Sequence, residues 1–294
     1  MRRATLAEIR DRTYKSTDAW WTVVLVDPLA ARLVWLVAPY RWITPNRLTA
    51  VATVLGLGAA GCFAGQSPGW LIAGALLFHL SFVVDCMDGK IARLNGTGSP
   101  FGAWFDFIFD RLRVVACAFT LLGGQHARTG DVRYWWTAIA IVGLDLLRYL
   151  NSAQMAKVRR DLRQQVARMR EAVGEQATLT MPAAVVGDPE QERGIRAGVK
   201  AFLLNRRIRT HLFSGIEFEM AVFIVGPLTG TVMATSIIAG LLLLAFELRL
   251  IYYFWRMTRR YTARLARLAM MAESLVATEV RVDNGLSGSG RQRV

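Results

Sequence analysis

The sequence has few cysteines and histidines, which argues against the sites that these residues usually build. Three of each occur in 294 residues. Cys62, Cys86 and Cys117 stand apart, in or beside apolar segments, with no CxxC pair and no histidine cluster. We therefore predict neither a disulfide nor a zinc site, and an ordinary packing role for each cysteine.

The start of the chain lacks the apolar stretch of a secretory leader. Its first 20 residues are polar and charged, so we expect no cleavable signal peptide. We expect membrane insertion to begin with the first spanning helix.

Acidic residues are fewer than basic ones, and the net charge is +14. We nevertheless expect no nucleic-acid partner. The basic residues gather at both termini and between 157 and 209, whereas the turns at 64–69 and 227–230 carry no charge.

Long apolar runs, by contrast, are abundant. The sequence is 53% hydrophobic with a mean hydropathy of +0.30, and about 20 mostly apolar residues cross a bilayer as a helix. Six candidate runs lie at roughly 46–65, 69–86, 101–123, 134–156, 211–227 and 229–255. They predict an all-α integral membrane protein with six transmembrane helices. The positive-inside rule predicts a multi-pass protein of the cell (inner) membrane, with both termini, the 87–100 turn and the 157–210 segment in the cytoplasm.

Three regions are expected along the chain. Residues 1–43 form N-terminal interfacial helices, and residues 44–258 form the six-helix domain with a cytoplasmic helical insertion at 157–210. Residues 259–294 form a basic tail that is disordered after about residue 280. Basic segments beside membrane spans attract anionic head groups, so membrane lipids are expected partners.

The N-terminal region mixes tryptophan, leucine and valine with charged side chains. Pro28 and Pro39 interrupt the stretch Ser16–Tyr40, and each piece is too short and too charged to span. Amphipathic helices along the membrane surface are predicted, with a seventh, broken span as the alternative. Thr44 and Pro45 suit the N-cap and first turn of the first span.

Four aspartates occur among segments that are otherwise apolar. Asp85 and Asp88 are three residues apart, and Asp106 and Asp110 are four apart, so on helices each pair shares a face. The short turn at 95–100 makes the two helices antiparallel neighbours. The two carboxylate pairs are therefore predicted to meet near the cytoplasmic end of the membrane.

Converged carboxylates need a cation, because burying uncompensated charge is very costly. All-oxygen ligation without cysteine or histidine suits Mg²⁺ or Mn²⁺, and two such ions would balance four carboxylates. Gly89, Ala92 and Gly102 remove side chains where a ligand approaches the backbone, and Arg93 can reach a phosphate by paired hydrogen bonds. The residues thus predict a two-metal phosphoryl-transfer site. The alternative is a proton relay or an ion path in a cation transporter.

The spacing D-x2-D-G-x2-A-R-x8-G-x3-D-x3-D, from Asp85 to Asp110, resembles the motif of the CDP-alcohol phosphotransferase family at every position. The resemblance also covers the six-span layout and the interfacial N-terminus. It implies transfer of a substituted phosphate from a CDP-linked donor to an alcohol acceptor, with release of CMP, in phospholipid biosynthesis. It also implies a homodimer with its active site on the cytoplasmic side.

The resemblance assigns roles to individual residues. The four aspartates would hold two divalent cations, and Asp110 would also act as the base for the acceptor hydroxyl. The CDP-linked donor would contact residues at the starts of two helices and in the motif, namely Asn46, Arg47, Thr49, Gly89, Ala92, Arg93, Ser99 and Gly102. CDP-diacylglycerol is the first expectation for the donor. The alternative is a soluble CDP-alcohol such as CDP-inositol, joined to a polyol phosphate.

Other charges lie within the predicted spans and are functional candidates by their depth. Arg111 and Arg148 could bind a phosphate on the acceptor, as in relatives that use inositol phosphate. Alternatively, Asp145 and Arg148, three residues apart, pair with each other. An aspartate-rich membrane prenyltransferase is a further alternative, although DxxDG differs from the DDxxD or NDxxD motifs of that class.

Overall fold

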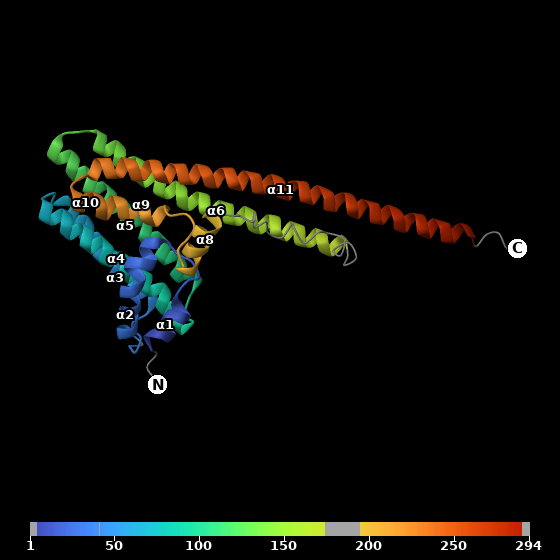
Figure 1. Ribbon diagram of the computed structural model, residues 1–294, viewed down its shortest axis with the longest axis horizontal. Helices are drawn as coiled ribbons and strands as arrows, with labels where there is room; N and C mark the ends of the chain where they lie inside the picture. The colour runs from blue at the N-terminus through green and yellow to red at the C-terminus, as the bar shows by residue number, and fades with distance from the viewer. Residues whose placement is uncertain (1–4, 41, 174–194, 290–294) are drawn as a thin grey trace. The chain divides into compact units, whose positions relative to one another are not determined.

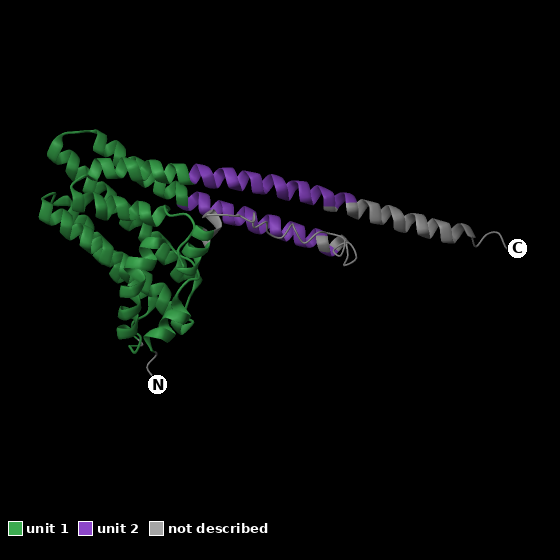
Figure 2. Ribbon diagram, viewed as in Figure 1, with its two compact units in different colours: residues 1–148, 193–246 green, residues 149–192, 247–294 purple. Residues whose placement is uncertain are grey.

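The computed structural model describes residues 5–40, 42–173 and 195–289, and the regular elements in these ranges are helices (Figure 1). A single isolated bridge joins Asp18 and Ile208 in this part of the chain. Two compact units are distinguished (Figure 2). Residues 1–148 and 193–246 form unit 1, and residues 149–192 and 247–294 form unit 2. All of the candidate site residues belong to unit 1.

The N-terminal region is helical, as predicted, but Pro28 does not interrupt it. Helix α1 spans Leu6–Thr13, a π-helical segment spans Thr22–Val26, and α2 spans Asp27–Val37. The Asp27 N–H bonds to the Thr22 carbonyl, five residues back. This wider turn precedes Pro28, which has no N–H to donate, and so the helix continues through the proline.

Helices α3, α4 and α5 form the centre of unit 1. They span Pro45–Ala64, Pro68–Asn95 and Pro100–Thr129, and α3 packs against both of the others. As predicted, Thr44 caps α3, where its side chain accepts the Arg47 N–H. Gly96 ends α4 at φ 65°, a backbone conformation that suits glycine. These caps fix the short connection that makes α4 and α5 neighbours.

The later helices differ from prediction at their ends. Helix α6 spans Arg133–Val173 and α8 spans Ile195–Asn205. In the region of the fifth predicted span, helix begins at residue 215 rather than 211. It consists of α9 (Gly215–Met220), a π-helical segment (Ala221–Val225) and α10 (Gly226–Thr229). Helix α11 runs through Val232–Ser289. The predicted disorder after about residue 280 is thus replaced by helix as far as Ser289, because the preceding Ala-, Leu-, Arg- and Glu-rich stretch propagates it. Residues 174–194 of the predicted 157–210 insertion lie outside the described residues.

Three helices in the described ranges are long and apolar enough to cross a membrane: α3, α4 and the Val232–Arg267 part of α11. They expose large apolar side chains such as Val54, Leu76 and Leu241, which suits contact with lipid. The chain is therefore a membrane protein. Helix length and composition together therefore establish fewer spans in the described residues than the six expected.

The apolar core of unit 1 lies next to the aspartates, with Arg113 in contact with both. Phe78 of α4 contacts Phe223 with ring centroids 4.8 Å apart, and Phe63 of α3 lies 6.4 Å from the same ring. Gly74 permits this approach, because a Cβ there would lie 2.6 Å from the Phe63 ring. The Arg113 guanidinium stacks 5.9 Å from the Phe78 ring and marks the transition from core to site.

Candidate metal centre and nucleotide-donor site

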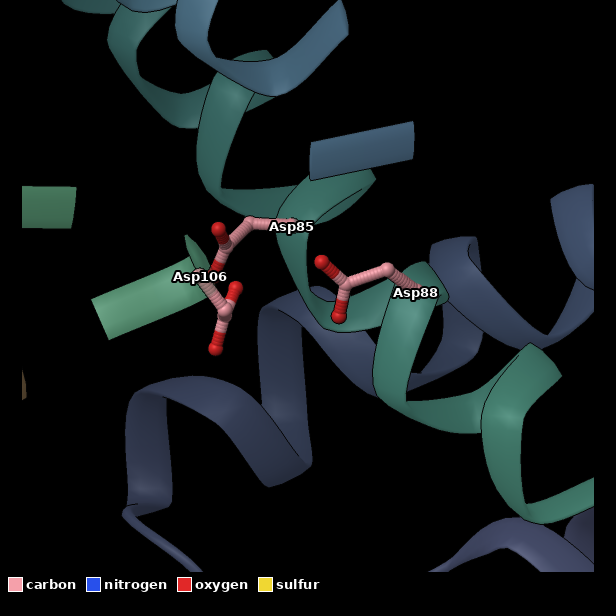
Figure 3. Close-up of side chains that lie close together, drawn as sticks. All are labelled: Asp85, Asp88 and Asp106. Carbon is pink, nitrogen blue, oxygen red and sulfur yellow. The ribbon is translucent and has the colours of Figure 1, made fainter. Parts of the chain in front are cut away.

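Three of the four aspartates converge between α4 and α5. Asp85 and Asp88 extend from α4 and Asp106 from α5, and their carboxylates point into one shared space (Figure 3). One oxygen from each lies within 4.8 Å of the other two. Asp106 Oδ1 is buried and has no hydrogen-bond partner in the structure. A buried carboxylate oxygen without a donor suits a cation, and this trio could hold a metal ion.

Thr49 fixes one of these carboxylates from the first turns of α3. Its hydroxyl donates to Asp88 Oδ2 at 2.5 Å, and both residues are buried. Thr49 was predicted to contact the donor, and the structure places it against a candidate metal ligand. A short hydrogen bond to an ionised carboxylate favours one orientation of that group. The beginning of α3 therefore shapes the metal centre.

Asp110 is held by Arg113, one turn further along α5. Arg113 Nη2 donates to Asp110 Oδ1 at 2.6 Å, and Arg113 Nη1 lies 3.5 Å from Asp85 Oδ1. The same Nη1 donates to Ser81 Oγ at 3.0 Å. Asp110 is thus oriented by an arginine and lies beside the three-carboxylate group. One guanidinium balances only one of four carboxylates, so cations can compensate the remainder.

Glycine permits the close approach of Arg113. A Cβ at Gly56 of α3 would overlap the Cδ of Arg113, so any larger residue would displace the arginine stem. Gly102 serves a similar purpose at the donor side. A Cβ there would lie 3.0 Å from Asn46 Oδ1 and 3.1 Å from Ser99 Oγ. The structure therefore brings the starts of α3 and α5 together beside Gly102. That these residues contact a donor stays a prediction.

The remaining predicted donor residues have distinct positions. The Arg93 guanidinium extends back over Gly89, where a Cβ would lie 3.3 Å from Nη1. Ser99 caps α5 by accepting the Gly102 N–H at 3.0 Å. Ala92 is half-buried on α4, one residue before Arg93. Arg47 is exposed, and its guanidinium donates to the Trp42 carbonyl at 2.6 Å, in the stretch just before α3.

The two predicted acceptor residues lie in a second group of charges. Arg111 is buried and forms ion pairs with Asp145 of α6 and, at 3.3 Å, with Glu219 of α9. Asp145 is thus a partner of Arg111, a pairing that the sequence did not indicate. The Arg148 guanidinium lies 5.3 Å from the Phe246 ring centroid, and a Cβ at Gly215 would lie 2.5 Å from Arg148 Nε.

Sequence reasoning assigned no role to Arg113 or Glu219. Arg113 was detectable, because it follows Asp110 by three residues and so shares its helix face. Glu219 is 108 residues from Arg111 in the sequence. Only the packing of α9 against the other helices brings that pair together.

Comparison with known proteins agrees with this geometry. The family model described as CDP-alcohol phosphatidyltransferase matches residues 42–186, which include all four aspartates. The chain belongs to the CDP-alcohol phosphatidyltransferase family. The family resemblance predicted from the aspartate spacing is thereby confirmed.

Several curated proteins are similar to this member of the family. It is 29% identical over 168 residues to phosphatidylinositol phosphate synthase of Corynebacterium glutamicum. The aligned region covers 57% of this chain and 65% of that protein. It is 33% identical over 107 residues to archaetidylinositol phosphate synthase of Pyrococcus horikoshii, covering 36% and 53%. It is 31% identical over 106 residues to the bifunctional IPC transferase and DIPP synthase of Aquifex aeolicus, covering 36% and 23%. The chain thus matches less than two thirds of the length of each of these relatives.

Proposed function

We propose that this chain is a CDP-alcohol phosphotransferase. It transfers a substituted phosphate from a CDP-linked donor to an alcohol acceptor and releases CMP, as a step in phospholipid biosynthesis. The observation that carries the proposal is the convergence of Asp85 and Asp88 of α4 with Asp106 of α5, within the segment that matches the family. Asp106 Oδ1, which has no hydrogen-bond partner, is free to bind a cation, and Asp110 would add a fourth carboxylate.

Two divalent cations, Mg²⁺ or Mn²⁺, are the proposed cofactors, held by Asp85, Asp88, Asp106 and Asp110. When bound, such ions neutralise a pyrophosphate and stabilise a leaving phosphate. Asp110 is the proposed base for the acceptor hydroxyl, and a positioned base typically contributes about 10²–10⁴-fold in rate. The Arg113 Nη2 donor holds the Asp110 carboxylate in one orientation, which leaves its other oxygen to receive the hydroxyl proton.

The donor is proposed to lie where α3, α4 and α5 meet. Gly102 leaves room there between Asn46 and Ser99, and Gly89 leaves room beneath the Arg93 guanidinium. Arg93 provides paired donors to a phosphate oxygen, whereas Ala92 limits side-chain bulk on the same helix. Arg47 and Thr49 complete the proposed set from the beginning of α3.

CDP-diacylglycerol is the proposed donor, and a phosphorylated polyol such as inositol phosphate is the acceptor that the similar proteins favour. Two of them are named as synthases of inositol-phosphate lipids. Arg111 and Arg148 are the proposed residues for the acceptor phosphate. A second candidate joins a soluble CDP-alcohol such as CDP-inositol to a polyol phosphate, and it is favoured by the similarity to the bifunctional IPC transferase and DIPP synthase.

The proposed membrane arrangement follows the charge distribution. The helical segments from α3 to α11 would provide six spans, with both termini and the active site at the cytoplasmic face of the inner membrane. The proposed domain division keeps residues 1–43 at the interface and residues 259–294 as a basic extension. A homodimer is the proposed assembly.

The test is a donor and acceptor screen with the full chain in lipid nanodiscs and Mg²⁺. CDP-diacylglycerol and CDP-inositol are each paired with inositol phosphate, inositol, glycerol phosphate and serine, and CMP release is measured. Release that depends on both substrates supports the proposal. Ion flux into liposomes without CMP release would instead identify a cation transporter. Turnover of prenyl diphosphates that CMP does not inhibit would identify a prenyltransferase.

A further inference from the structure

A buried ionic cluster joins the N-terminal region to the helix that carries the motif. The Asp27 side chain is only 3% exposed, and it lies between two cations. Its Oδ1 accepts from Lys90 Nζ at 2.7 Å, and its Oδ2 accepts from Arg207 Nη2 at 3.0 Å. Lys90 lies within the motif segment, at an unspecified position directly after Gly89. We call Asp27, Lys90 and Arg207 the Asp27 cluster.

The cluster holds the segment Thr13–Lys15 in place. The Tyr14 hydroxyl donates to the Asp27 carbonyl at 3.0 Å, and the Arg207 guanidinium stacks 4.1 Å from the Tyr14 ring centroid. Arg207 Nε also donates to the Lys15 carbonyl at 3.0 Å. Burial and then the Asp27 carboxylate raise the pKa of Tyr14 from its usual value, which is already above neutral pH.

The segment held in this way contacts a donor-site residue. Arg93 Nε donates to the Thr13 carbonyl at 2.8 Å, next to Tyr14. With Nε anchored, the Arg93 Nη1 lies over Gly89, 3.3 Å from where a Cβ would be. Arg93 and Lys90 are three residues apart and share one face of α4. The N-terminal segment therefore contacts both residues from the same side.

Arg207 adopts a backbone conformation that is unusual for its type. Its φ is 63°, in the left-handed region where residues other than glycine are uncommon. This conformation closes α8: the Arg207 N–H donates to the Leu204 carbonyl at 2.9 Å and the Ile208 N–H donates to the Leu203 carbonyl at 2.8 Å, the bonding pattern of a helix C-cap. The Asp18 N–H then donates to the Arg207 carbonyl at 2.8 Å, and the Arg209 N–H donates to the Asp18 carbonyl at 2.9 Å. Strain of this kind persists only where surrounding contacts determine it.

A buried ion pair usually adds little stability compared with well-packed apolar side chains. The Asp27 cluster is therefore better explained by the positions in which it holds its neighbours than by stability. We propose that Asp27, Lys90 and Arg207 are positioning residues for the donor site. They hold Thr13–Lys15 so that the Thr13 carbonyl keeps the Arg93 guanidinium over Gly89, where it meets a donor phosphate. This inference rests on the proposed function.

The test compares Arg207→Gln with wild type, as the full chain in nanodiscs with Mg²⁺. The kinetic probe is CDP-diacylglycerol, with whichever acceptor supports CMP release, and the binding probe is CDP alone, followed by calorimetry. Loss of a hydrogen bond to a charged group is expected to raise the KM for donor and the Kd for CDP about tenfold. The KM for acceptor and kcat should change less than about twofold, since Arg93 contacts neither the acceptor nor Asp110 in this scheme. Arg207→Lys, which keeps the charge beside Asp27, should recover part of the donor affinity.

Arg209→Gln is the matched control. Arg209 Nη2 donates to Asp18 Oδ1 at 3.2 Å, so it joins the same two segments without contacting Tyr14, Asp27 or α4. Its donor KM should equal that of wild type. Equal donor KM values for Arg207→Gln and Arg209→Gln, or a fall in kcat alone, would overturn the inference. If Arg207→Gln does not fold, Tyr14→Phe replaces it, with a smaller rise in donor KM expected and an unchanged value counting against the inference.

The proposed function fails in a different way. A wild-type protein that releases no CMP from any CDP-linked donor overturns the proposed function and this inference with it. An active wild type with an unaffected Arg207→Gln variant overturns the positioning role alone.

Discussion

The hydrogen bond from Thr49 to Asp88 provides the sharpest test of the metal centre. Thr49→Val keeps the side-chain shape but removes the hydroxyl that donates to Asp88 Oδ2 at 2.5 Å. Hydrogen bonds to charged groups contribute about 1.5–3 kcal/mol. Since about 1.4 kcal/mol corresponds to a factor of ten, the variant should lose about 10- to 100-fold in Mg²⁺ affinity if the whole bond acts through the carboxylate.

The assay measures the Mg²⁺ concentration that gives half-maximal CMP release, together with thermal unfolding in detergent at several Mg²⁺ concentrations. Thr53→Val is the matched control, because Thr53 lies one turn further along α3 and its hydroxyl donates only to the Thr49 carbonyl, at 2.9 Å, among the hydrogen bonds of this region. Thr49→Val should need much more Mg²⁺ than Thr53→Val. Equal Mg²⁺ requirements in the two variants would refute the view that α3 orients a metal ligand.

Three further predictions concern the helix contacts around the site. Gly102→Val should raise the KM for donor at least about tenfold, because its Cβ would crowd Asn46 and Ser99. The control is Gly98→Val, whose Cβ would meet nothing within 4 Å. Equal donor KM values in the two variants would contradict the placing of the donor beside Gly102. Arg113→Gln should lower kcat about 10²-fold or more at saturating donor, because Asp110 loses its orienting partner; unchanged turnover would argue against Asp110 as the base. Gly74→Ala should destabilise the folded state by about 1–3 kcal/mol through overpacking against Phe63, as followed by detergent melting, and an unchanged melting temperature would contradict the packing of α3 on α4.

The local part of the site was predictable because helical spacing is a short-range property. The intervals between Asp85 and Asp88 and between Asp106 and Asp110 place each pair on one helix face, and the short turn after Asn95 brings α4 and α5 together. The trio in the structure agrees with that expectation. Arg113 could have been found in the same way from its distance to Asp110.

Contacts between distant segments were not predictable from spacing. The Lys90 partner Asp27 lies 63 residues away, in the N-terminal region that was expected to lie along the membrane surface. Pro28 was expected to interrupt the N-terminal helix, because proline breaks the hydrogen-bond pattern of a regular α-helix. A π-helical turn before Pro28 has a different hydrogen-bond pattern and accommodates the proline. Such features depend on which faces of the helices pack together, which the sequence pattern alone does not specify.

The most direct test of the two-metal proposal is CMP release by wild type and Asp106→Asn, measured side by side with CDP-diacylglycerol, acceptor and Mg²⁺. Asp106 supplies the buried, unpartnered oxygen of the carboxylate group, and asparagine keeps its size while removing its charge. We expect metal-dependent release by wild type and none by the variant, with both proteins folded and eluting alike in detergent. Wild-type turnover by the folded Asp106→Asn protein would contradict the proposal.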